Sequence, residues 1–324
     1  LPHSSSDDQR KYRTPEELEE NRKRDPLTIL EDQCIQEKMF SPQDFVKIRD
    51  QISKQVDEES KWAESQEHPD ADKALDHIYS HKVPMDEPDL NPMGNKVVIV
   101  DAVNHALKEE MARNDKMVIY GQDIADPKGG VFTATKGLSD TFGKDRVFNS
   151  PLAESSIVGT AIGMAVTGYK PVVEIQFGDY IWTAMMQIQN ELITMRYRSN
   201  NEWNCPVVIR VPVGGYIHGG PYHSQSIDRY FFHMPGILVA YPSNAADAKG
   251  LLKAACRMDD PVMIFEHKGL YRQGYASSPE PDNNYILPFG KAKLIQDGDE
   301  LTIVTWGAMV QKCIEAIKIS EMDQ

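Results

Sequence analysis

The spacing of apolar residues changes once along this chain of 324 residues, near residue 95. Before that point apolar side chains recur every three or four positions among many charges, as at Phe45, Ile48 and Ile52. Such spacing predicts helices that each bury one apolar stripe. Beyond it, short apolar runs alternate with longer helical patterns, which is typical of a parallel sheet covered by helices.

The first part, residues 1–82, is predicted to be helical. Thr14, Asp25 and Ser41 each stand directly before a proline, and a capping side chain followed by proline marks a helix start. The long helix that begins after Ser41 carries the apolar stripe, so we expect it to lie on something larger. A further short helix is predicted at about 69–79.

A proline-rich linker at 83–95 leads into the predicted sheet domain, residues 96–276. Apolar runs that predict buried strands lie at 117–120, 146–148, 171–177, 206–211, 237–241 and 262–265. Helical patterns lie at about 97–113, 155–167, 180–198 and 244–257. The predicted fold class is therefore α/β, with a parallel, doubly wound sheet.

The remaining residues, 277–324, predict only the beginning of a second α/β domain. The run at 301–306 has the composition of a strand, and the amphipathic pattern at 310–319 predicts a helix. One strand followed by one helix is a single unit of such a domain.

Charge and cysteine usage exclude several classes of partner. The chain has 35 basic and 49 acidic residues, a formal net charge of -14, which repels phosphate backbones and anionic lipids. Neither nucleic acid nor a membrane is therefore expected as a partner, and no apolar run approaches the roughly 20 residues of a membrane helix. The four cysteines lie far apart, which predicts neither a zinc site nor a disulfide framework and favours a reducing cytoplasm.

Glu154 lies among small residues at the start of an apolar helical pattern. A carboxylate there is costly unless something pairs with it. The free amides and the positive end of the following helix favour a carboxylate, so capping alone accounts for it. Alternatively, an acid in an apolar cleft can share a proton with a nitrogen of a ligand. The residues by themselves leave both explanations open.

Gly159 and Gly163 stand four residues apart in the helix after Glu154. They share one helix face and predict close packing against another backbone. The spacing lacks the G-x-G turn that brings backbone amides to a pyrophosphate, so no nicotinamide dinucleotide site is expected here.

Two loop segments add polar candidates. His223 lies in the segment 219–226, whose glycines and proline argue against a helix or a strand. An average loop histidine is only solvated, but the glycine pairs at 214–215 and 219–220 indicate a backbone held close to something. His3 and the serines and aspartates after it form a second polar cluster, which alone would be taken for a frayed terminus.

Several motifs of the second part occur together in a fixed order. They are Gly129-Gly-Val-Phe132, Asp145-Arg-Val-Phe-Asn149, Pro151-Leu-Ala-Glu154, Glu174-Ile-Gln-Phe-Gly-Asp-Tyr180 and Tyr222-His-Ser-Gln225. With them, residues 95–324 resemble the beta subunit of the thiamine-diphosphate-dependent 2-oxo acid dehydrogenase component, in the transketolase-like superfamily. The resemblance implies a pyrimidine-binding domain of the transketolase type.

The first part resembles the C-terminal end of the alpha subunit of the same enzyme. The segments that carry this resemblance are His3-Ser-Ser-Ser-Asp-Asp8, Tyr12-Arg13 and His77-Ile-Tyr-Ser80. The resemblance implies an alpha-beta fusion, natural or engineered, with an upstream alpha-subunit region as partner. In some relatives the position matching Ser4 carries a regulatory phosphoserine.

The resemblance assigns cofactor roles to residues of the second part. Glu154 matches the glutamate that hydrogen-bonds the aminopyrimidine ring of the cofactor and helps it reach the imino form that deprotonates the thiazolium carbon. Leu152, Gln176 and Tyr180 match positions that line the pyrimidine and substrate pocket.

Further roles follow for the two loop clusters. His223 and His3 match the two histidines that guide protons and the lipoyl group in the family. Asp7, Tyr12 and Arg13 match positions that order the alpha-subunit loop. With Glu154, the two histidines are the catalytic candidates.

The cofactor site is only half represented in the sequence. In the family, a Gly-Asp-Gly motif and a following asparagine of the alpha subunit hold diphosphate and Mg²⁺, and this sequence has no such motif. The resemblance thus implies thiamine diphosphate with Mg²⁺ ligands outside this segment, which alone is expected to be inactive. Gln122 in place of a glutamate, and Ser155 and Ser156 in place of a Gln-Gly pair, are expected to tune the pocket.

Potassium is a further ion that the resemblance suggests. Cys256 and Asp259 lie near a place where relatives bind a structural potassium ion. An ordinary helix end accounts for these two residues as well.

The implied reaction is oxidative decarboxylation of a 2-oxo acid, with acyl transfer to the lipoyl group of a dihydrolipoyl acyltransferase. The motifs at 174–177, 197–199 and 222–226 resemble the branched-chain type, which acts on 2-oxoisovalerate, and 77–80 resembles the pyruvate type. We favour the branched-chain type, in a homo-oligomer because the family's site is split between subunits. A different class also fits the acidic helical start and the missing phosphate site, namely a non-catalytic assembly module.

Overall fold

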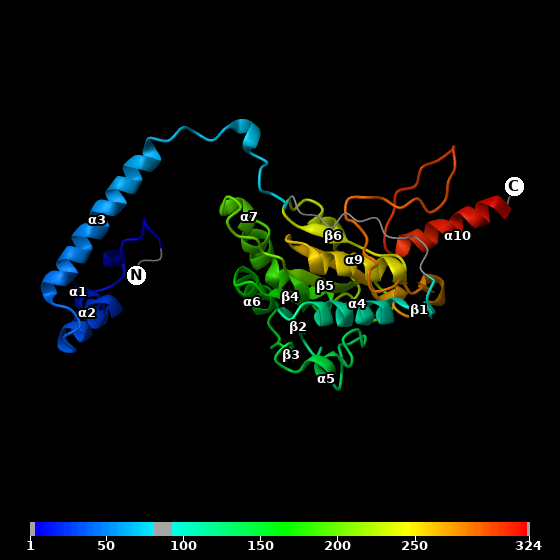
Figure 1. Ribbon diagram of the computed structural model, residues 1–324, viewed down its shortest axis with the longest axis horizontal. Coiled ribbons are helices and arrows are strands. Elements are labelled where there is room, and N and C mark those ends of the chain that lie inside the picture. The colour runs from blue at the N-terminus through cyan, green and yellow to red at the C-terminus, as the bar shows by residue number, and fades with distance from the viewer. Residues whose placement is uncertain (1–3, 81–92, 323–324) are drawn as a thin grey trace. The chain divides into compact units, whose positions relative to one another are not determined.

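The computed structural model describes residues 4–80 and 93–322. The chain divides after Ala74 into two compact units, residues 1–74 and 75–324 (Figure 1). None of the helices within the described ranges has the length and apolar character needed to cross a membrane.

The first unit is helical, as predicted. Its α-helices are α1 (Pro15–Lys23), α2 (Pro26–Gln36) and α3 (Pro42–Glu64), with 3-10 turns η1 (Gln9–Lys11) and η2 (Ala71–Lys73). Thr14, Asp25 and Ser41 each accept a hydrogen bond from a backbone amide of the first turn, which confirms the three predicted helix starts. The helix expected at 69–79 is only η2, and His77, with a φ of 63°, excludes a right-handed helix that continues through residue 77.

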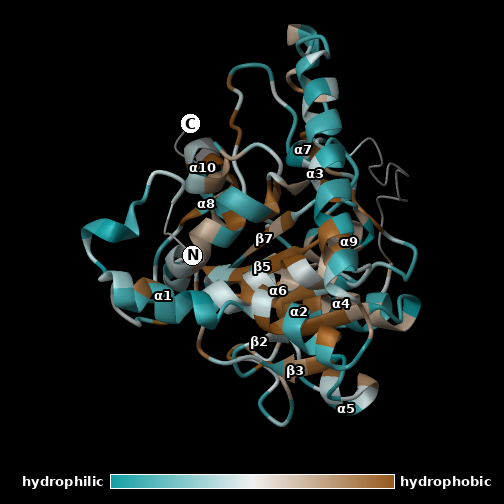
Figure 2. Ribbon diagram, turned by 90° about the vertical axis from the view of Figure 1, so that its left-hand side faces the viewer, coloured by the Kyte–Doolittle hydropathy of each residue, from teal (hydrophilic) through white to brown (hydrophobic). Residues whose placement is uncertain are grey.

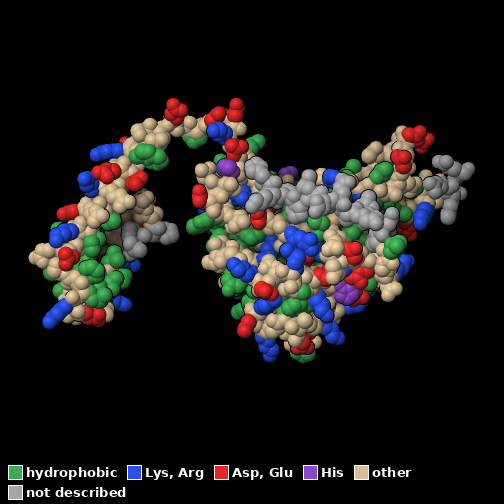
Figure 3. Space-filling view, viewed as in Figure 1, with side chains coloured by type: hydrophobic (Ala, Val, Ile, Leu, Met, Phe, Trp, Pro, Cys, Tyr) green, Lys and Arg blue, Asp and Glu red, His purple; other side chains and the backbone are tan. Residues whose placement is uncertain are grey.

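The apolar stripe of α3 stays uncovered within this unit. Ile48, Ile52, Val56 and Trp62 are all exposed, and α3 has no buried residue. Figure 3 shows apolar side chains gathered on the visible face of this unit. The stripe is therefore a helix face without a core beneath it in the first unit.

The second unit is built on a six-stranded sheet in the order β3-β2-β4-β5-β7-β6, in which every pair is parallel (Figure 1). The strands are β2 (Met117–Gly121), β3 (Val147–Asn149), β4 (Lys170–Glu174), β5 (Val208–Val213), β6 (Leu238–Ala240) and β7 (Val262–His267). All six coincide with predicted runs to within a few residues. Most of their apolar side chains are buried. In Figure 2 the ribbon of the sheet is coloured largely as hydrophobic.

Helices cover both faces of the sheet, which confirms the doubly wound arrangement. On one face α4 (Ile99–Arg113) and α9 (Ala245–Arg257) pack against each other and against one apolar cluster. On the other face α6 (Glu154–Val166) packs against η3 (Gly178–Ala184), within a second cluster. Each fully buried valine or isoleucine contributes about 1.5–3 kcal/mol of transfer free energy. Shorter helices are α5 (Leu138–Phe142), α7 (Met195–Arg198) and α8 (Asp228–Phe231), with 3-10 turns η5 (Lys268–Leu270) and η6 (Gly274–Ala276).

The helix predicted at 180–198 is divided into three pieces. The 3-10 segment η3 is followed by a π-helical segment, η4 (Gln187–Leu192), and then by α7. The tight first piece brings Gly178 against β5, where a Cβ atom would lie 2.9 Å from Val213. Departures of this kind from α-helical geometry are often found at functional sites.

The segment after the sheet differs most from its prediction. No strand forms at 301–306, and Leu301 and Val304 are exposed. A strand needs a neighbour to satisfy its backbone groups, and within the described residues this run has none. The predicted helix is present as α10 (Ala308–Met322).

The two ends of the sheet domain meet. The short strands β1 (Lys96–Val97) and β8 (Ser278–Pro279) pair in antiparallel fashion, with Lys96 opposite Pro279. Flanking hydrogen bonds from the Gly94 amide to the Glu280 carbonyl and from the Glu280 amide to the Asn95 carbonyl extend the pairing. The chain therefore enters and leaves the domain at one place.

Candidate active site

Glu154 is the first residue of α6, and its side chain reaches across the end of the sheet. The Gln122 side-chain amide donates a hydrogen bond of 2.8 Å to its Oε1, and the Thr183 hydroxyl lies 3.1 Å from its Oε2. The residue at the helix N-cap is Ala153, and no side-chain cap hydrogen bond forms there. The positive end of the helix still favours the carboxylate, but its hydrogen bonds do not cap the helix.

The two donors to Glu154 come from separate elements. Gln122 directly follows β2 and is only 2% exposed, so its amide is held firmly. Thr183 lies in η3, and its backbone carbonyl accepts a hydrogen bond from the Ser155 hydroxyl. A carboxylate can only accept hydrogen bonds, so Glu154 accepts at both oxygens, in each case from a neutral donor.

Tyr180 and His223 form a hydrogen-bonded pair. The Tyr180 hydroxyl lies 2.7 Å from His223 Nε2, and His223 Nδ1 lies 2.9 Å from the Gly219 carbonyl oxygen. Burial raises the pKa of Tyr180, and the negative charges of Asp179 and Glu154 raise it further. The phenol is therefore a hydrogen-bond donor at neutral pH.

Gln176 joins the same edge of the sheet more loosely. Its amide nitrogen lies 3.5 Å from the Asp123 carboxylate, which also accepts a 2.6 Å hydrogen bond from Lys128. The hydrogen bond from Lys128 is the main cause of the lowered pKa of Asp123. Leu152, in contrast, is 86% exposed. The Thr183 hydroxyl, which contacts Glu154, also lies 3.2 Å from the Tyr180 carbonyl oxygen, so Glu154, Tyr180 and His223 form one connected group that leaves Leu152 outside it.

The topology explains why these side chains converge. Gln122 follows β2, Gln176 follows β4, and His223 lies in the loop after β5. Strands β2, β4 and β5 are adjacent and parallel, so their carboxyl ends share one edge of the sheet. Ligands of open α/β sheets bind at that edge.

Sequence reasoning missed a buried charge cluster beneath this edge. Arg210 is fully buried and donates to Glu174 at 2.8 Å and to Glu266 at 2.7 Å, while the Tyr271 hydroxyl donates to Glu266 at 2.6 Å. Burial raises the pKa of Glu174 although Arg210 opposes the shift. The cluster ties β4, β5 and β7 together, with Glu174 and Glu266 near the carboxyl ends of their strands. The sequence indicates this cluster only by placing a charged residue in each of three largely apolar strands.

The candidates of the first unit are only partly described. His3 lies outside the described residues. The Tyr12 hydroxyl donates a 2.6 Å hydrogen bond to Asp7, and the Asp7 amide donates to the Ser4 carbonyl at 3.1 Å. Arg13 follows this loop and donates its amide to the Gln9 carbonyl at 2.9 Å. The predicted loop residues Asp7 and Tyr12 are thus in direct contact.

The residues suggested for potassium surround a lysine. Burial lowers the pKa of Lys170 to about 8, and its ammonium group donates a 2.9 Å hydrogen bond to the Met258 carbonyl, between Cys256 and Asp259. Burial also raises the pKa of the Cys256 thiol to about 12, so it is not an anionic ligand. The Asp259 carbonyl accepts from Arg196 at 3.1 Å. The carbonyls of Met258 and Asp259 thus already accept from cationic side chains, and potassium at Cys256 and Asp259 stays a prediction. Within the described residues no group of three or more His, Cys, Asp or Glu could hold a metal ion.

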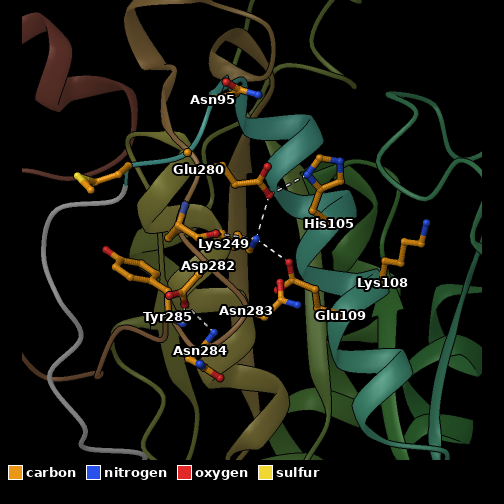
Figure 4. Close-up of a pocket in the computed structure, with 13 residues that line it drawn as sticks. Asn95, His105, Lys108, Glu109, Lys249, Glu280, Asp282, Asn283, Asn284 and Tyr285 are labelled. Atoms are coloured by element: carbon orange, nitrogen blue, oxygen red, sulfur yellow. Dashed lines mark hydrogen bonds and ion pairs between the residues drawn. The ribbon is translucent and has the colours of Figure 1, made fainter.

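A separate cavity of about 820 Å³ lies beside α4 and α9 and contains none of the candidate residues (Figure 4). Lys249 points into it and pairs with Glu109 at 2.6 Å and Glu280 at 2.9 Å, and Glu280 also contacts His105 at 2.8 Å. These bonds fasten the segment after β8 to the two helices. Lys249, Glu109, Glu280 and His105 therefore already have partners within the chain.

Comparisons with known proteins identify the family. Residues 95–273 match the family described as the transketolase pyrimidine-binding domain, and residues 1–72 match the dehydrogenase E1 component. The 2-oxoisovalerate dehydrogenase subunit beta of Bacillus subtilis is 47% identical over 224 residues, which cover 69% of this chain and 68% of that protein. The chain belongs to the 2-oxo acid dehydrogenase E1 family.

Some relatives of this E1 chain are named for 2-oxoisovalerate and others for pyruvate. The mitochondrial 2-oxoisovalerate dehydrogenase subunit beta of Dictyostelium discoideum is 44% identical over 70% of this chain and 60% of its own length. The pyruvate dehydrogenase E1 component subunit beta of Bacillus subtilis is 40% identical over 70% of this chain and 69% of its own length. The E1 chain thus spans only part of each relative.

A solved structure supports the fold of this E1 chain. A split gene transketolase, described as an inactive beta4 tetramer, aligns with a TM-score of 0.54 and 24% identity, covering 70% of this chain and 67% of that one. At this identity the likeness concerns the fold alone. It agrees with the parallel sheet and the helices on both of its faces.

Proposed function

We propose that this chain supplies the pyrimidine-binding part of a thiamine-diphosphate-dependent 2-oxo acid dehydrogenase of the branched-chain type. The single observation that carries the proposal is the arrangement of Glu154, whose two oxygens accept from the neutral donors Gln122 and Thr183. Each carboxylate oxygen has two lone pairs, so each keeps one acceptor position for a ligand nitrogen. A carboxylate with a free acceptor position fits a protonated ring nitrogen of an aminopyrimidine.

The residues of the chain divide the work in the proposed reaction. Glu154 shares a proton with a ring nitrogen of the cofactor, and Gln176 and Tyr180 line the pocket beside it. His223 holds or moves a proton near the reacting atoms, and His3 is proposed for the same role. When bound, thiamine diphosphate supplies the electron sink for the loss of carbon dioxide. The product acyl group passes to the lipoyl group of a dihydrolipoyl acyltransferase.

The other end of the cofactor requires sequence outside this chain. Diphosphate and Mg²⁺ are held in the family by a Gly-Asp-Gly motif, which is absent from these 324 residues. We therefore propose an upstream alpha-subunit region as the partner that completes the site, within a homo-oligomer. The four cysteines are free, with Cys205 and Cys256 buried, which supports a reducing compartment such as the cytoplasm.

Substrate preference is argued from the relatives and the motifs together. The B. subtilis 2-oxoisovalerate dehydrogenase subunit is 47% identical, against 40% for the pyruvate dehydrogenase subunit of the same organism. The motifs at 174–177, 197–199 and 222–226 point the same way. Pyruvate is the second candidate, because the pyruvate-type relatives match nearly the same length of this chain.

The test uses a protein extended upstream through the alpha-subunit region. We expect it to bind thiamine diphosphate with Mg²⁺ in a calorimetric titration, and to turn over 2-oxoisovalerate with a higher kcat/KM than pyruvate. Higher kcat/KM with pyruvate would reverse the substrate assignment. An extended protein that neither binds the cofactor nor decarboxylates either acid would instead favour the non-catalytic assembly module.

A further inference from the structure

Both ring nitrogens of His223 are engaged, and their partners differ in kind. The Gly219 carbonyl oxygen, 2.9 Å from Nδ1, can only accept, so Nδ1 carries the proton. The Tyr180 hydroxyl lies 2.7 Å from Nε2 and retains its proton at neutral pH, because burial raises the pKa of the phenol. Tyr180 therefore donates to an unprotonated Nε2. The hydrogen bond at each nitrogen selects the same neutral tautomer.

The loop is shaped around this imidazole. A Cβ atom on residue 219 would lie 2.6 Å from the Cβ of His223, so only glycine allows the carbonyl to approach Nδ1 this closely. The ring of Phe177 meets the imidazole edge to face, with centroids 4.7 Å apart and planes at 85°. The orientation of the ring is thus fixed by packing as well as by hydrogen bonds.

The residue before Tyr180 holds the same loop from the other side. The two carboxylate oxygens of Asp179 accept from the backbone amides of Ser224 and Gln225, at 3.3 and 3.4 Å. Asp179 therefore contacts the backbone of the loop, and Tyr180 contacts the imidazole that the loop carries. Since η3 also carries Thr183, which contacts Glu154, the same short segment touches both proton-handling candidates.

We propose that Tyr180 is a positioning residue that fixes His223 as its Nδ1-protonated tautomer and caps Nε2, so that His223 enters the reaction as a proton acceptor at Nε2. The role of His223 as a proton acceptor rests on the proposed function of the site. When Nε2 takes up a proton, the Tyr180 hydroxyl turns so that its oxygen accepts from the new Nε2–H, and the resulting imidazolium keeps its Nδ1–H bond to Gly219. The same proton leaves from Nε2 in the later step, so the cycle is balanced.

The tautomer can be measured on this chain alone, without cofactor. The chain is labelled with ¹⁵N-histidine, and two- and three-bond ¹H–¹⁵N correlations are recorded at about pH 8, above the ordinary histidine pKa of about 6.5. The signals of residue 223 are assigned by their loss in His223→Gln. We expect the pattern of a ring protonated at Nδ1.

Substitution then isolates the contribution of Tyr180. In Tyr180→Phe the Nε2 donor is gone, and we expect a shift towards the Nε2-protonated form. Tyr222→Phe is the matched control, because Tyr222 adjoins His223 but is 71% exposed, and its spectrum should equal that of the wild type. An Nε2-protonated wild-type ring, or an unchanged tautomer in Tyr180→Phe, would overturn the positioning role.

The catalytic half is tested in the extended enzyme. Charged groups around the pair are Asp179 beside Tyr180 on η3, Glu154 at the start of α6, and Lys268 of η5, whose ammonium lies 5.3 Å from the Phe177 ring centre. We expect Tyr180→Phe to shift the acidic limb of the kcat/KM profile, while Tyr222→Phe leaves it in place. An unmoved limb in an active Tyr180→Phe enzyme would overturn the catalytic half. An inactive wild-type enzyme, by contrast, would refute the proposed function and leave the measured tautomer standing.

Discussion

The buried amide of Gln122 donates a 2.8 Å hydrogen bond to Oε1 of Glu154, across 32 residues of sequence. Gln122 is anchored at the end of β2, whereas Glu154 begins a helix on one face of the sheet. This hydrogen bond fixes the orientation of the Glu154 carboxylate, which could otherwise rotate freely. It also gives the carboxylate a neutral neighbour rather than a second acid.

Removing this donor should weaken catalysis more than folding. In Gln122→Met the Glu154 carboxylate loses one fixed partner, at a cost of about 1–3 kcal/mol in its orientation. We expect kcat/KM of the extended enzyme to fall roughly 10- to 100-fold. Steady-state kinetics with 2-oxoisovalerate checks this, and Gln273→Met, in a loop away from Glu154, serves as control. Equal rates for both variants would show that the hydrogen bond does not matter.

Glu154 itself is expected to be far more sensitive. Glu154→Gln keeps the size of the side chain but cannot share a proton with a ring nitrogen, so kcat should fall by roughly 10²–10⁴-fold. The melting temperature should change little, because the side chain is only half-buried, and the amide can accept from Gln122 at its oxygen and donate to the Thr183 hydroxyl from its nitrogen. Turnover close to that of the wild type would remove its assigned role.

The charge cluster at Arg210 should control stability. Arg210→Met leaves the carboxylates of Glu174 and Glu266 buried without their cation, and breaking such a pair costs about 3–5 kcal/mol. For a unit of this size the melting temperature should fall by roughly 6–20 °C. Thermal unfolding followed by circular dichroism measures the change, with the exposed Arg229→Met as control. Similar melting temperatures for the two variants would contradict the prediction.

Lys170 should give stability a distinct dependence on pH. Burial lowers its pKa from 10.5 to about 8 in the folded chain, so between these values the unfolded chain binds more protons. Stability contributed by this residue therefore rises with pH across that window. The free energy of unfolding of the wild type, relative to Lys170→Met, should increase from about pH 8 to pH 10.5.

Denaturant titrations at closely spaced pH values measure this difference. The exposed Lys144→Met is the control and should track the wild type throughout. A difference between wild type and Lys170→Met that is flat, or that falls across the window, would show that the folded-state pKa of Lys170 is not lowered.

The sheet could be predicted from sequence because its strands are marked locally. Runs such as the one around Val208 and Ile209 are apolar on both faces, as strands covered by helices on both sides must be. The run at 301–306 has similar composition but forms no strand, because strand formation depends on a neighbour and not on composition alone. Composition therefore indicated where strands are possible, and pairing decided which formed.

The roles of the site residues could be predicted from sequence only for residues in motifs that carry the family resemblance. Glu154, Tyr180 and His223 belong to recognisable motifs, and the structure connects them through hydrogen bonds that include Thr183, which contacts both Glu154 and the Tyr180 carbonyl. The Gln122 contact and the Arg210 cluster join residues that are tens of positions apart. No periodic pattern encodes such pairings, because they follow from the order in which the strands lie side by side.

The pairing of β1 with β8 has a mechanical consequence. Because Lys96 lies opposite Pro279, a pull applied between the segments that precede and follow the domain acts first on a few backbone hydrogen bonds. The load does not pass through the strand ends that carry Gln122 and Gln176. Movements of neighbouring segments can thus strain the antiparallel pairing of β1 with β8, while the carboxylate of Glu154 keeps its orientation.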